Sequence, residues 1–269
     1  MTNMIGFIGL GEMGFPMAKN LLKANYKVAS YDARPEAANE LRKSGATTCG
    51  SVQEVGRSCN EIIIMVRTTD QVEGIVQGKE GLLETCGKGA CIVIMSTIDP
   101  LAVRRMAAKA KEKSIEIIDA PVSGGRQGAE AATLSIMVGG NEKTFQKVLP
   151  ILEALGKKIA YLGSYGMGEV AKITNNLLLL IHMNAAYEAI SLAAKAGLTT
   201  ESLLKAVGPS TGNSWVLDHW DMVTSWKLNY KPEGTLDLIY KDFLLAFKLA
   251  QDLRIPLHLG AEASQLGRY

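Results

Sequence analysis

A glycine-rich turn near the N-terminus constrains the fold of this chain more than any other feature. The turn follows the apolar run Ile5–Ile8 and precedes an amphipathic stretch, and it consists of Gly9, Leu10, Gly11, Glu12, Met13 and Gly14. In a GxGxxG turn the first glycine permits a tight bend, the second lets a pyrophosphate approach the backbone, and the third allows close helix–strand packing. A glycine-rich turn without a ligand is the alternative. The strand–turn–helix context favours a dinucleotide site, with the pyrophosphate on the N–H groups that begin the helix.

An acidic residue ends the second predicted strand, which runs from Lys27 to Asp32. Asp32 lies 18 residues beyond Gly14, close to the separation of about 20 at which such an acid binds the ribose hydroxyls. A carboxylate here also repels a 2′-phosphate, so the sequence favours NAD over NADP. Arg34 complicates this prediction, because a guanidinium pairs well with phosphate. The alternative for Arg34 is a solvated arginine at a helix start.

Short β-branched runs alternate with amphipathic patterns throughout residues 1–163. This alternation is typical of a parallel sheet with helices on both faces. Strands are predicted at Ile5–Gly9, Lys27–Asp32, Glu61–Val66, Ala90–Ser96, Ile115–Ala120, Leu134–Val138 and Ile159–Leu162. Helices are predicted between them at Pro16–Ala24, Pro35–Ser44, Pro100–Lys113 and Glu142–Leu155. We therefore expect an α/β, doubly wound, Rossmann-type N-terminal domain over residues 1–163.

Residues 164–269 have no clear strand pattern and predict an all-α C-terminal domain. A long helix over Glu169–Ala196, stopped by Gly197, is expected to join the two domains. Further helices are predicted at Thr200–Val207, Asp218–Trp226 and Leu236–Leu253. A small helical domain built on a long Leu- and Ala-rich helix rarely buries itself alone. We therefore expect a homodimer or homotetramer.

Composition excludes several classes of partner. Lys+Arg 29 against Asp+Glu 27 gives a net charge of +2, so the clustered basic surface that binds nucleic acid or anionic lipid is not expected. The most apolar run, Leu177–Ile181, is too short to span a bilayer. No secretory signal is recognised, and we expect a cytoplasmic protein with reduced cysteines. The histidines lack metal-ligand spacing, which predicts no metal site; they are His182, His219 and His258.

Two polar constellations lie farther along the chain. A predicted strand runs into Ser123-Gly124-Gly125, a loop whose backbone N–H groups can form a nest for an anion, although an ordinary turn is the alternative. Lys172 and Asn176 are spaced i, i+4 on the long helix and share one face. Placed beside a nicotinamide, Lys172 could protonate a carbonyl oxygen as hydride arrives. Taken alone, such a pair is more often a solvated helix face.

Three segments resemble the hallmark motifs of the β-hydroxyacid dehydrogenases, a family that includes 3-hydroxyisobutyrate dehydrogenases and tartronate semialdehyde reductases. They are GFIGLGEMGFPMA over residues 6–18, DAPVSGG over residues 119–125, and GEVAKITNN over residues 168–176. The likeness runs from about residue 4 to about residue 260, with the motifs in the family's order and spacing.

The resemblance implies an NAD-dependent oxidoreductase that interconverts a small β-hydroxyacid and its semialdehyde or oxo acid. It implies that Lys172 is the general acid/base, that Asn176 positions the substrate, and that Ser123-Gly124-Gly125 binds the substrate carboxylate. It also implies that Ser96-Thr97 lies beside the nicotinamide and that Lys241, in a Lys-Asp pair, closes over the cofactor. The alternatives are an imine reductase-type enzyme, in which the lysine is typically another residue, and a non-catalytic dinucleotide-binding module.

Three positions depart from the family pattern. Relatives often carry Pro-Asn after the fourth strand, whereas this chain has Met65-Val66, so the loop that we expect to bind the cofactor differs. Arg126 directly follows the Ser-Gly-Gly loop; it either adds a cation for a second acidic group on the substrate or is an exposed loop arginine. The chain ends at Gly267-Arg268-Tyr269, short of a terminal helix that many relatives carry, which leaves open how one pocket wall or the oligomer contact is completed.

Overall fold

A computed structural model describes residues 4–229 and 234–266 of the 269-residue chain, so Gly267-Arg268-Tyr269 lie outside the described residues. The chain divides into two compact units, Met1–Lys172 and Ile173–Tyr269, called here the N-terminal unit and the helical unit. The predicted domain boundary between residues 163 and 164 stays a prediction. The element that crosses from one unit into the other is the long helix α9 (Met167–Lys195).

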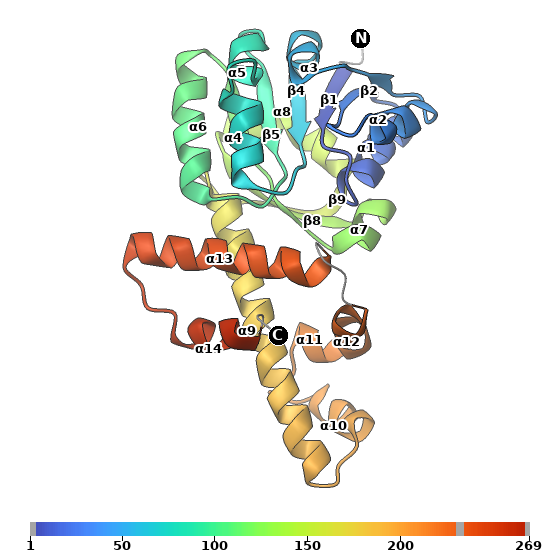
Figure 1. Ribbon diagram of the computed structural model, residues 1–269, viewed down its shortest axis with the longest axis vertical. Coiled ribbons are helices and arrows are strands. Elements are labelled where there is room, and N and C mark those ends of the chain that lie inside the picture. The colour runs from blue at the N-terminus through green and yellow to red at the C-terminus, as the bar shows by residue number, and fades with distance from the viewer. Residues whose placement is uncertain (1–3, 230–233, 267–269) are drawn as a thin grey trace. The chain divides into compact units, whose positions relative to one another are not determined.

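A single nine-stranded sheet organises the N-terminal unit (Figure 1). Its order is β3-β2-β1-β4-β5-β6-β8-β7, and β9 pairs with β8. The strands are β1 (Met4–Ile8), β2 (Lys27–Tyr31), β3 (Thr47–Thr48), β4 (Glu61–Ile64), β5 (Cys91–Ile94), β6 (Glu116–Asp119), β7 (Val122–Ser123), β8 (Leu134–Gly140) and β9 (Gly156–Tyr161). The chain order reverses at β1, where a doubly wound sheet binds its ligand.

The predicted parallel sheet has antiparallel pairs at one edge, which the sequence did not indicate. The strands from β3 to β6 are parallel, but β8 runs antiparallel to both β6 and β7. Only 14 residues separate the end of β6 at Asp119 from the start of β8 at Leu134, and they hold a short helix rather than a full crossover. A β-branched run marks a strand but does not give its direction.

Helices cover both faces of the sheet, each over its own core (Figure 1). One core packs α1 (Gly14–Lys23), α2 (Pro35–Arg42), α7 (Gly125–Ala131) and α8 (Glu142–Glu153) against residues such as Phe7 and Ile63. The other packs α3 (Val52–Ser58), α4 (Thr69–Gln77), α5 (Leu82–Thr85) and α6 (Pro100–Glu112) against residues such as Ile64 and Ile92. The predicted doubly wound fold is confirmed.

The short elements were not predicted from periodicity, because too few residues carry a repeat. They are β3, β7, α3, α4, α5 and α7. Local capping does mark two of these helices. Ser51 accepts a hydrogen bond from the backbone N–H of Glu54 at the start of α3, and Thr68 and Gln71 form a capping box at the start of α4.

The helical unit holds the remainder of α9 and five further helices within the described residues. They are α10 (Thr200–Val207), α11 (Trp215–Asp218), α12 (Trp220–Leu228), α13 (Thr235–Leu253) and α14 (His258–Leu266). The helix predicted over Asp218–Trp226 corresponds to α12, which begins two residues later at Trp220, and the helices α11 and α14 were not predicted. Two small cores hold this unit together, one around Met183 and Val223 and the other around Leu180 and Phe243.

The helix α9 is long and apolar enough, by length and composition alone, to cross a membrane. The predicted length of the apolar stretch, based on Leu177–Ile181, was too short, because alanines and isoleucines on both sides extend the stretch. Only 17% of the most apolar 18-residue window is buried. One such helix is weak support for a membrane, since the core helices of soluble proteins pass the same test.

Candidate active site

The glycines of the GxGxxG turn have the geometry that a dinucleotide site requires. Gly9, after the end of β1, has a φ of 96°, and a Cβ placed on it would lie 2.2 Å from the Met65 carbonyl oxygen. A Cβ on Gly14 would lie 2.0 Å from the Gly9 carbonyl oxygen. A Cβ on Gly11 would meet no atom within 4 Å. The backbone at Gly11 is therefore open, as close approach of a pyrophosphate needs, while Gly9 and Gly14 are required by packing.

Asp32 follows β2 at the same edge of the sheet. Its Oδ2 accepts a hydrogen bond from the Leu10 N–H at 2.6 Å, and its Oδ1 accepts from the Arg34 N–H at 2.8 Å and the Arg34 Nε at 3.1 Å. Burial raises the pKa of Asp32, but the hydrogen bonds from Arg34 and Leu10 lower it more, so the pKa lies below its usual value. The carboxylate is ionised at neutral pH, and it engages the guanidinium that might otherwise attract a phosphate.

The loops that follow β4 and β5 are joined by a buried serine. Ser96 is fully buried, and its Oγ accepts a hydrogen bond from the Val66 N–H at 2.8 Å. The Met65 N–H donates to the Ile8 carbonyl oxygen at 2.8 Å. Residues 65–66 and 96–97 therefore lie at the carboxyl edge of the sheet, together with the glycine-rich turn and Asp32. Open α/β sheets bind ligands at this edge.

The loop at Ser123-Gly124-Gly125 depends on glycine. Gly124 has a φ of 127° and Gly125 a φ of 59°, values that favour glycine strongly. The loop leads into α7, and the Asn20 Nδ2 on α1 donates to the Ala129 carbonyl oxygen at 2.6 Å, near the end of α7. The helix that carries this loop is thus tied to the helix that begins at the glycine-rich turn.

Arg126, in the first turn of α7, is exposed and already has an acidic partner. Its Nε lies 2.7 Å from the Glu130 Oε1, one helical turn away. A salt bridge between two exposed residues contributes little to stability. An incoming anion can therefore replace Glu130 at low cost.

A buried carboxylate anchors the start of α9 to the sheet. Asp119, at the end of β6, accepts hydrogen bonds from the Gly166 N–H at 2.8 Å and the Glu169 N–H at 3.0 Å. Burial raises the pKa of Asp119, and these backbone donors offset part of that rise. Glycine is required at Gly168, because a Cβ there would lie 2.2 Å from the Met137 carbonyl oxygen. The first turn of α9 is therefore held at the carboxyl end of β6.

Glu169 adds a second attachment between α9 and the sheet. Its side chain is fully buried, and its Oε2 accepts a hydrogen bond from the Ile98 N–H at 3.1 Å. Ile98 directly follows Ser96-Thr97, so the first turn of α9 is bound to the ends of both β5 and β6. Lys172 lies one turn farther along α9 and is 8% exposed. The structure thus places Lys172 on a helix that starts at the carboxyl edge where the predicted nucleotide-binding residues lie.

The remaining predicted residues belong to the helical unit. Asn176 is 3% exposed, and its Nδ2 donates to the Asp242 Oδ2 on α13 at 2.6 Å. The Lys241 Nζ lies 3.0 Å from the Asp242 Oδ1. Asp242 therefore fixes the side chains of Asn176 and Lys241, which come from different helices.

Two family models together match almost the whole chain. The NAD binding domain of 6-phosphogluconate dehydrogenase matches residues 4–163, and the NAD-binding of NADP-dependent 3-hydroxyisobutyrate dehydrogenase matches residues 166–269. A relative, 2-(hydroxymethyl)glutarate dehydrogenase of Eubacterium barkeri, is 38% identical over 262 residues, which cover 97% of this chain and 87% of that protein. The chain belongs to the β-hydroxyacid dehydrogenase family.

Two further relatives agree with this assignment. The NAD-dependent L-serine dehydrogenase of Pseudomonas aeruginosa is 36% identical and covers 98% of this chain and 91% of its own. The solved structure of Mycobacterium tuberculosis 3-hydroxyisobutyrate dehydrogenase with L-serine has a TM-score of 0.91 at 32% identity, and the match covers 100% of this chain and 93% of that one. Solved imine reductases at 18–20% identity share the fold alone. This member of the family is an NAD-binding oxidoreductase.

Sequence reasoning did not assign a role to four polar residues of this dehydrogenase: Asn20, Asp119, Glu169 and Asp242. Asp119 and Glu169 stand in the motifs that carry the resemblance, and Asp242 stands in the Lys-Asp pair with Lys241. Their positions were visible in the sequence, but their contacts were not. An acid such as Glu169 in the first turn of a helix is most often solvated, so its burial was not expected. Their partners lie between 47 and 109 residues away in the chain.

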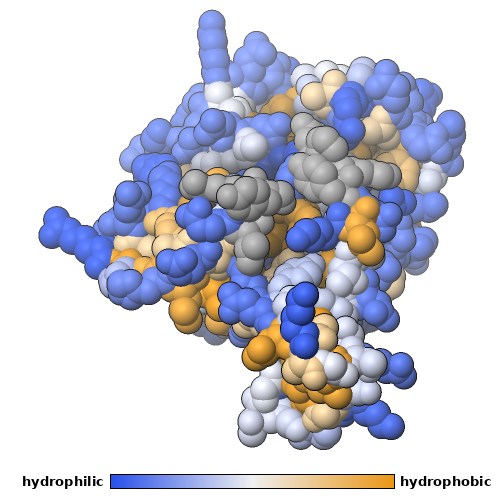
Figure 2. Space-filling view, turned by 60° about the horizontal axis from the view of Figure 1, so that its bottom comes forward, coloured by the Kyte–Doolittle hydropathy of each residue, from blue (hydrophilic) through white to orange (hydrophobic). Residues whose placement is uncertain are grey.

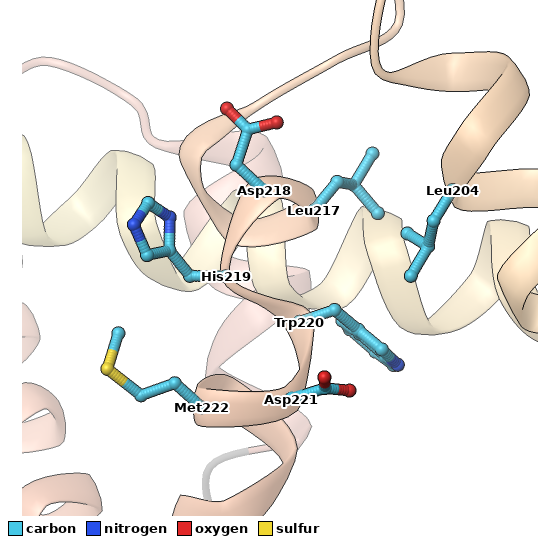
Figure 3. Close-up of a pocket in the computed structure, with 7 residues that line it drawn as sticks. All are labelled: Leu204, Leu217, Asp218, His219, Trp220, Asp221 and Met222. Carbon is cyan, nitrogen blue, oxygen red and sulfur yellow. The ribbon is translucent and has the colours of Figure 1, made fainter.

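A pocket in the helical unit holds none of the predicted site residues. It is lined by residues of α10, α11 and α12 and by His219 between the last two, as Figure 3 shows: Leu204, Leu217, Asp218, His219, Trp220, Asp221 and Met222. Within the described residues, no group of three His, Cys, Asp or Glu side chains could hold a metal ion. Burial raises the pKa of Cys59 to about 12 and that of Cys86 to about 11, so these thiols stay protonated and are poor nucleophiles.

Proposed function

We propose that this dehydrogenase interconverts a 2-substituted 3-hydroxypropanoate and its semialdehyde, with Lys172 as the general acid/base. The names of the relatives support the substrate class, because 3-hydroxyisobutyrate, 2-(hydroxymethyl)glutarate and L-serine all carry a hydroxymethyl group on the carbon next to a carboxylate. One observation carries the mechanism. The buried Lys172 lies on a helix whose first turn is bound to the carboxyl ends of β5 and β6.

The residues at the carboxyl edge fit a dinucleotide. The glycine-rich turn would hold the pyrophosphate and Asp32 the ribose hydroxyls, and residues 65–66 and 96–97 would line the nicotinamide side. Lys241 would contribute from the helical unit. When bound, the nicotinamide supplies or accepts the hydride.

Lys172 would transfer the proton to and from the substrate oxygen. In the oxidation direction a neutral Lys172 amine removes the hydroxyl proton while the C–H bond gives up its hydride, so the alcohol carbon becomes an aldehyde. In the reduction direction the ammonium returns that proton to the carbonyl oxygen. General acid–base catalysis of this kind contributes about 10²–10⁴-fold to a rate.

Two groups would orient the substrate. The backbone N–H groups of Ser123-Gly124-Gly125 and the Ser123 hydroxyl would bind its carboxylate, and Asn176, whose Nδ2 is held by Asp242, would contact the substrate. Arg126 would release Glu130 and bind a second carboxylate, as in a glutarate-type substrate. A substrate panel should therefore include both monocarboxylic and dicarboxylic semialdehydes.

The test is NADH and NADPH oxidation against a panel of short semialdehydes, with Lys172→Ala assayed beside the wild type. We expect one semialdehyde to be reduced with NADH, and we expect Lys172→Ala to lower kcat about 10²–10⁴-fold while NADH still binds. Lys158→Ala, which removes an exposed lysine on β9, is the control and should keep full activity. Turnover by Lys172→Ala at the wild-type rate would disprove the role of Lys172. Binding of NADH without turnover of any panel member would support a binding module instead.

We also propose that the molecule is a homodimer or homotetramer in which a second copy covers the helical unit. Among the described residues of this unit, nine large apolar side chains are exposed in the single chain, and Figure 2 shows apolar surface open to solvent. They are Leu178, Leu192, Leu198, Trp215, Leu228, Leu244, Leu253, Ile255 and Leu259. Where exposed apolar side chains form a contiguous patch, the patch is typical of an interaction site.

A further inference from the structure

The first turn of α9 holds a second buried ionisable group that the mechanism above does not use. Glu169 is fully buried and stands three residues before Lys172 on the same helix. Side chains three residues apart on an α-helix are neighbours, with about 5–6 Å between their Cβ atoms. A buried carboxylate is costly unless a hydrogen bond or an opposite charge compensates it.

We propose that Glu169 is a positioning residue that places a negative charge beside Lys172 and so sets the pH range over which Lys172 exchanges its proton. The inference rests on the proposed role of Lys172. The hydrogen bond from the Ile98 N–H to Glu169 Oε2 holds the carboxylate group against the loop after β5. The hydrogen bond from the Glu169 N–H to Asp119 holds its backbone. Glu169 is therefore fixed at both ends and cannot turn away into solvent.

Several other charged groups near this turn have partners within the described residues. The Arg104 Nε donates to the Tyr165 carbonyl oxygen at 3.3 Å, directly before the turn. Both oxygens of Asp119 accept backbone N–H groups, from Gly166 and Glu169. The Asp99 Oδ1 accepts from the Leu101 N–H at 2.8 Å, where it caps α6. Farther along α9, Asn176 donates to Asp242, which is ion-paired with Lys241. Among these acids, Glu169 is the one on the same helix and one turn from Lys172.

Electrostatics determines the direction in which Glu169 shifts the deprotonation of Lys172. A nearby carboxylate stabilises the ammonium form of a lysine, because opposite charges attract more strongly where water is excluded. Replacing Glu169 by glutamine keeps a side-chain oxygen for the Ile98 N–H and removes only the charge. The ammonium of Lys172 should then lose its proton at a lower pH, by about one to two pH units.

The experiment compares the wild type with Glu169→Gln, Glu169→Asp and Glu61→Gln. In the free enzyme, labelling of Lys172 by acetic anhydride is followed against pH by peptide mass spectrometry, which reports deprotonation of the amine without any turnover. With NADH and the best semialdehyde, kcat for reduction is measured against pH. For Glu169→Gln we expect the labelling midpoint and the alkaline fall in kcat to move to lower pH together. Glu169→Asp, which keeps the charge, should restore the wild-type midpoint at a reduced kcat.

Glu61→Gln is the matched control. Glu61 is also a buried glutamate, 4% exposed, but it stands at the start of β4 and pairs with Lys147, at the edge of the sheet opposite the nucleotide-binding turn. Its replacement should leave both midpoints unchanged. An unchanged labelling midpoint in Glu169→Gln would overturn the inference, and so would equal shifts in Glu169→Gln and Glu169→Asp. A labelling shift in an enzyme whose Lys172→Ala variant keeps full activity would refute the proposed catalysis and leave the charge relation standing.

Discussion

At the scale of single residues, we propose that the charge and the contacts of Asp32 favour NAD over NADP. One carboxylate oxygen accepts the Leu10 N–H of the glycine-rich turn, and the other accepts two donors of Arg34. The side chain is thereby oriented by the turn itself. It also neutralises the arginine that stands nearest, so a phosphate on the ribose would meet a carboxylate rather than a free cation.

Replacing Asp32 by asparagine should weaken the preference for NADH. The variant keeps the shape of the side chain and removes its charge, so a ribose hydroxyl loses an ionic acceptor and a 2′-phosphate is no longer repelled. Hydrogen bonds to charged groups contribute about 1.5–3 kcal/mol, and we expect the ratio of the NADPH to NADH dissociation constants to fall about tenfold or more. Fluorescence titration with each cofactor measures it. The exposed Glu36→Gln in α2 is the control, and an unchanged ratio in Asp32→Asn would show that this charge does not select the cofactor.

At the scale of elements, the beginning of α9 is attached to the sheet by side-chain hydrogen bonds. A helix leaves its first N–H groups without intrahelical partners, and a carboxylate at this end is favourable both as an acceptor and as a charge. Asp119 accepts two of these groups from the end of β6. The helix that carries Lys172 is therefore positioned by a strand of the sheet rather than by its own sequence.

Asp119→Ala should destabilise the protein measurably. The substitution leaves the N–H groups of Gly166 and Glu169 without their charged acceptor, and we expect the free energy of unfolding to fall by about 3 kcal/mol. Urea denaturation followed by circular dichroism measures this change. Asp70→Ala, which removes an exposed acid from the first turn of α4, should leave the midpoint almost unchanged. Equal midpoints for the wild type and Asp119→Ala would refute the anchoring role.

At the scale of the whole molecule, the two units differ in how completely each is buried. The N-terminal unit has a large core on each face of its sheet, whereas the helical unit has two small cores and most of the exposed large apolar residues. We propose that a second copy of the chain covers the exposed apolar residues of the helical unit. A cytoplasmic location stays a prediction, as do the absence of nucleic-acid and membrane partners.

Sedimentation of the purified chain without detergent should give a dimer or tetramer. The double variant Leu192→Glu/Leu259→Glu places charges on side chains that are 74% and 71% exposed, and it should shift the species toward the monomer because charged residues are costly in a buried interface. Leu162→Glu, in the N-terminal unit, is the control. A monomeric wild type would contradict the proposal, and so would a chain that stays in solution only with detergent, which would indicate a membrane partner for α9.

The sequence alone was sufficient for the features that depend on local backbone chemistry. The glycine spacing, the acid after β2, the main helices and strands, and the doubly wound class all follow from steric and periodic constraints within a few residues. The tertiary structure decided what depends on distant partners. These features are the antiparallel direction of β8, the burial of Asp119 against the backbone at the start of α9, and the burial of Glu169 against the loop after β5. Glu169 meets Ile98 across 71 residues, and Asn176 meets Asp242 across 66. The residues around an acid are the same whether its side chain ends in water or in the protein interior. The local sequence therefore does not predict such distant pairs.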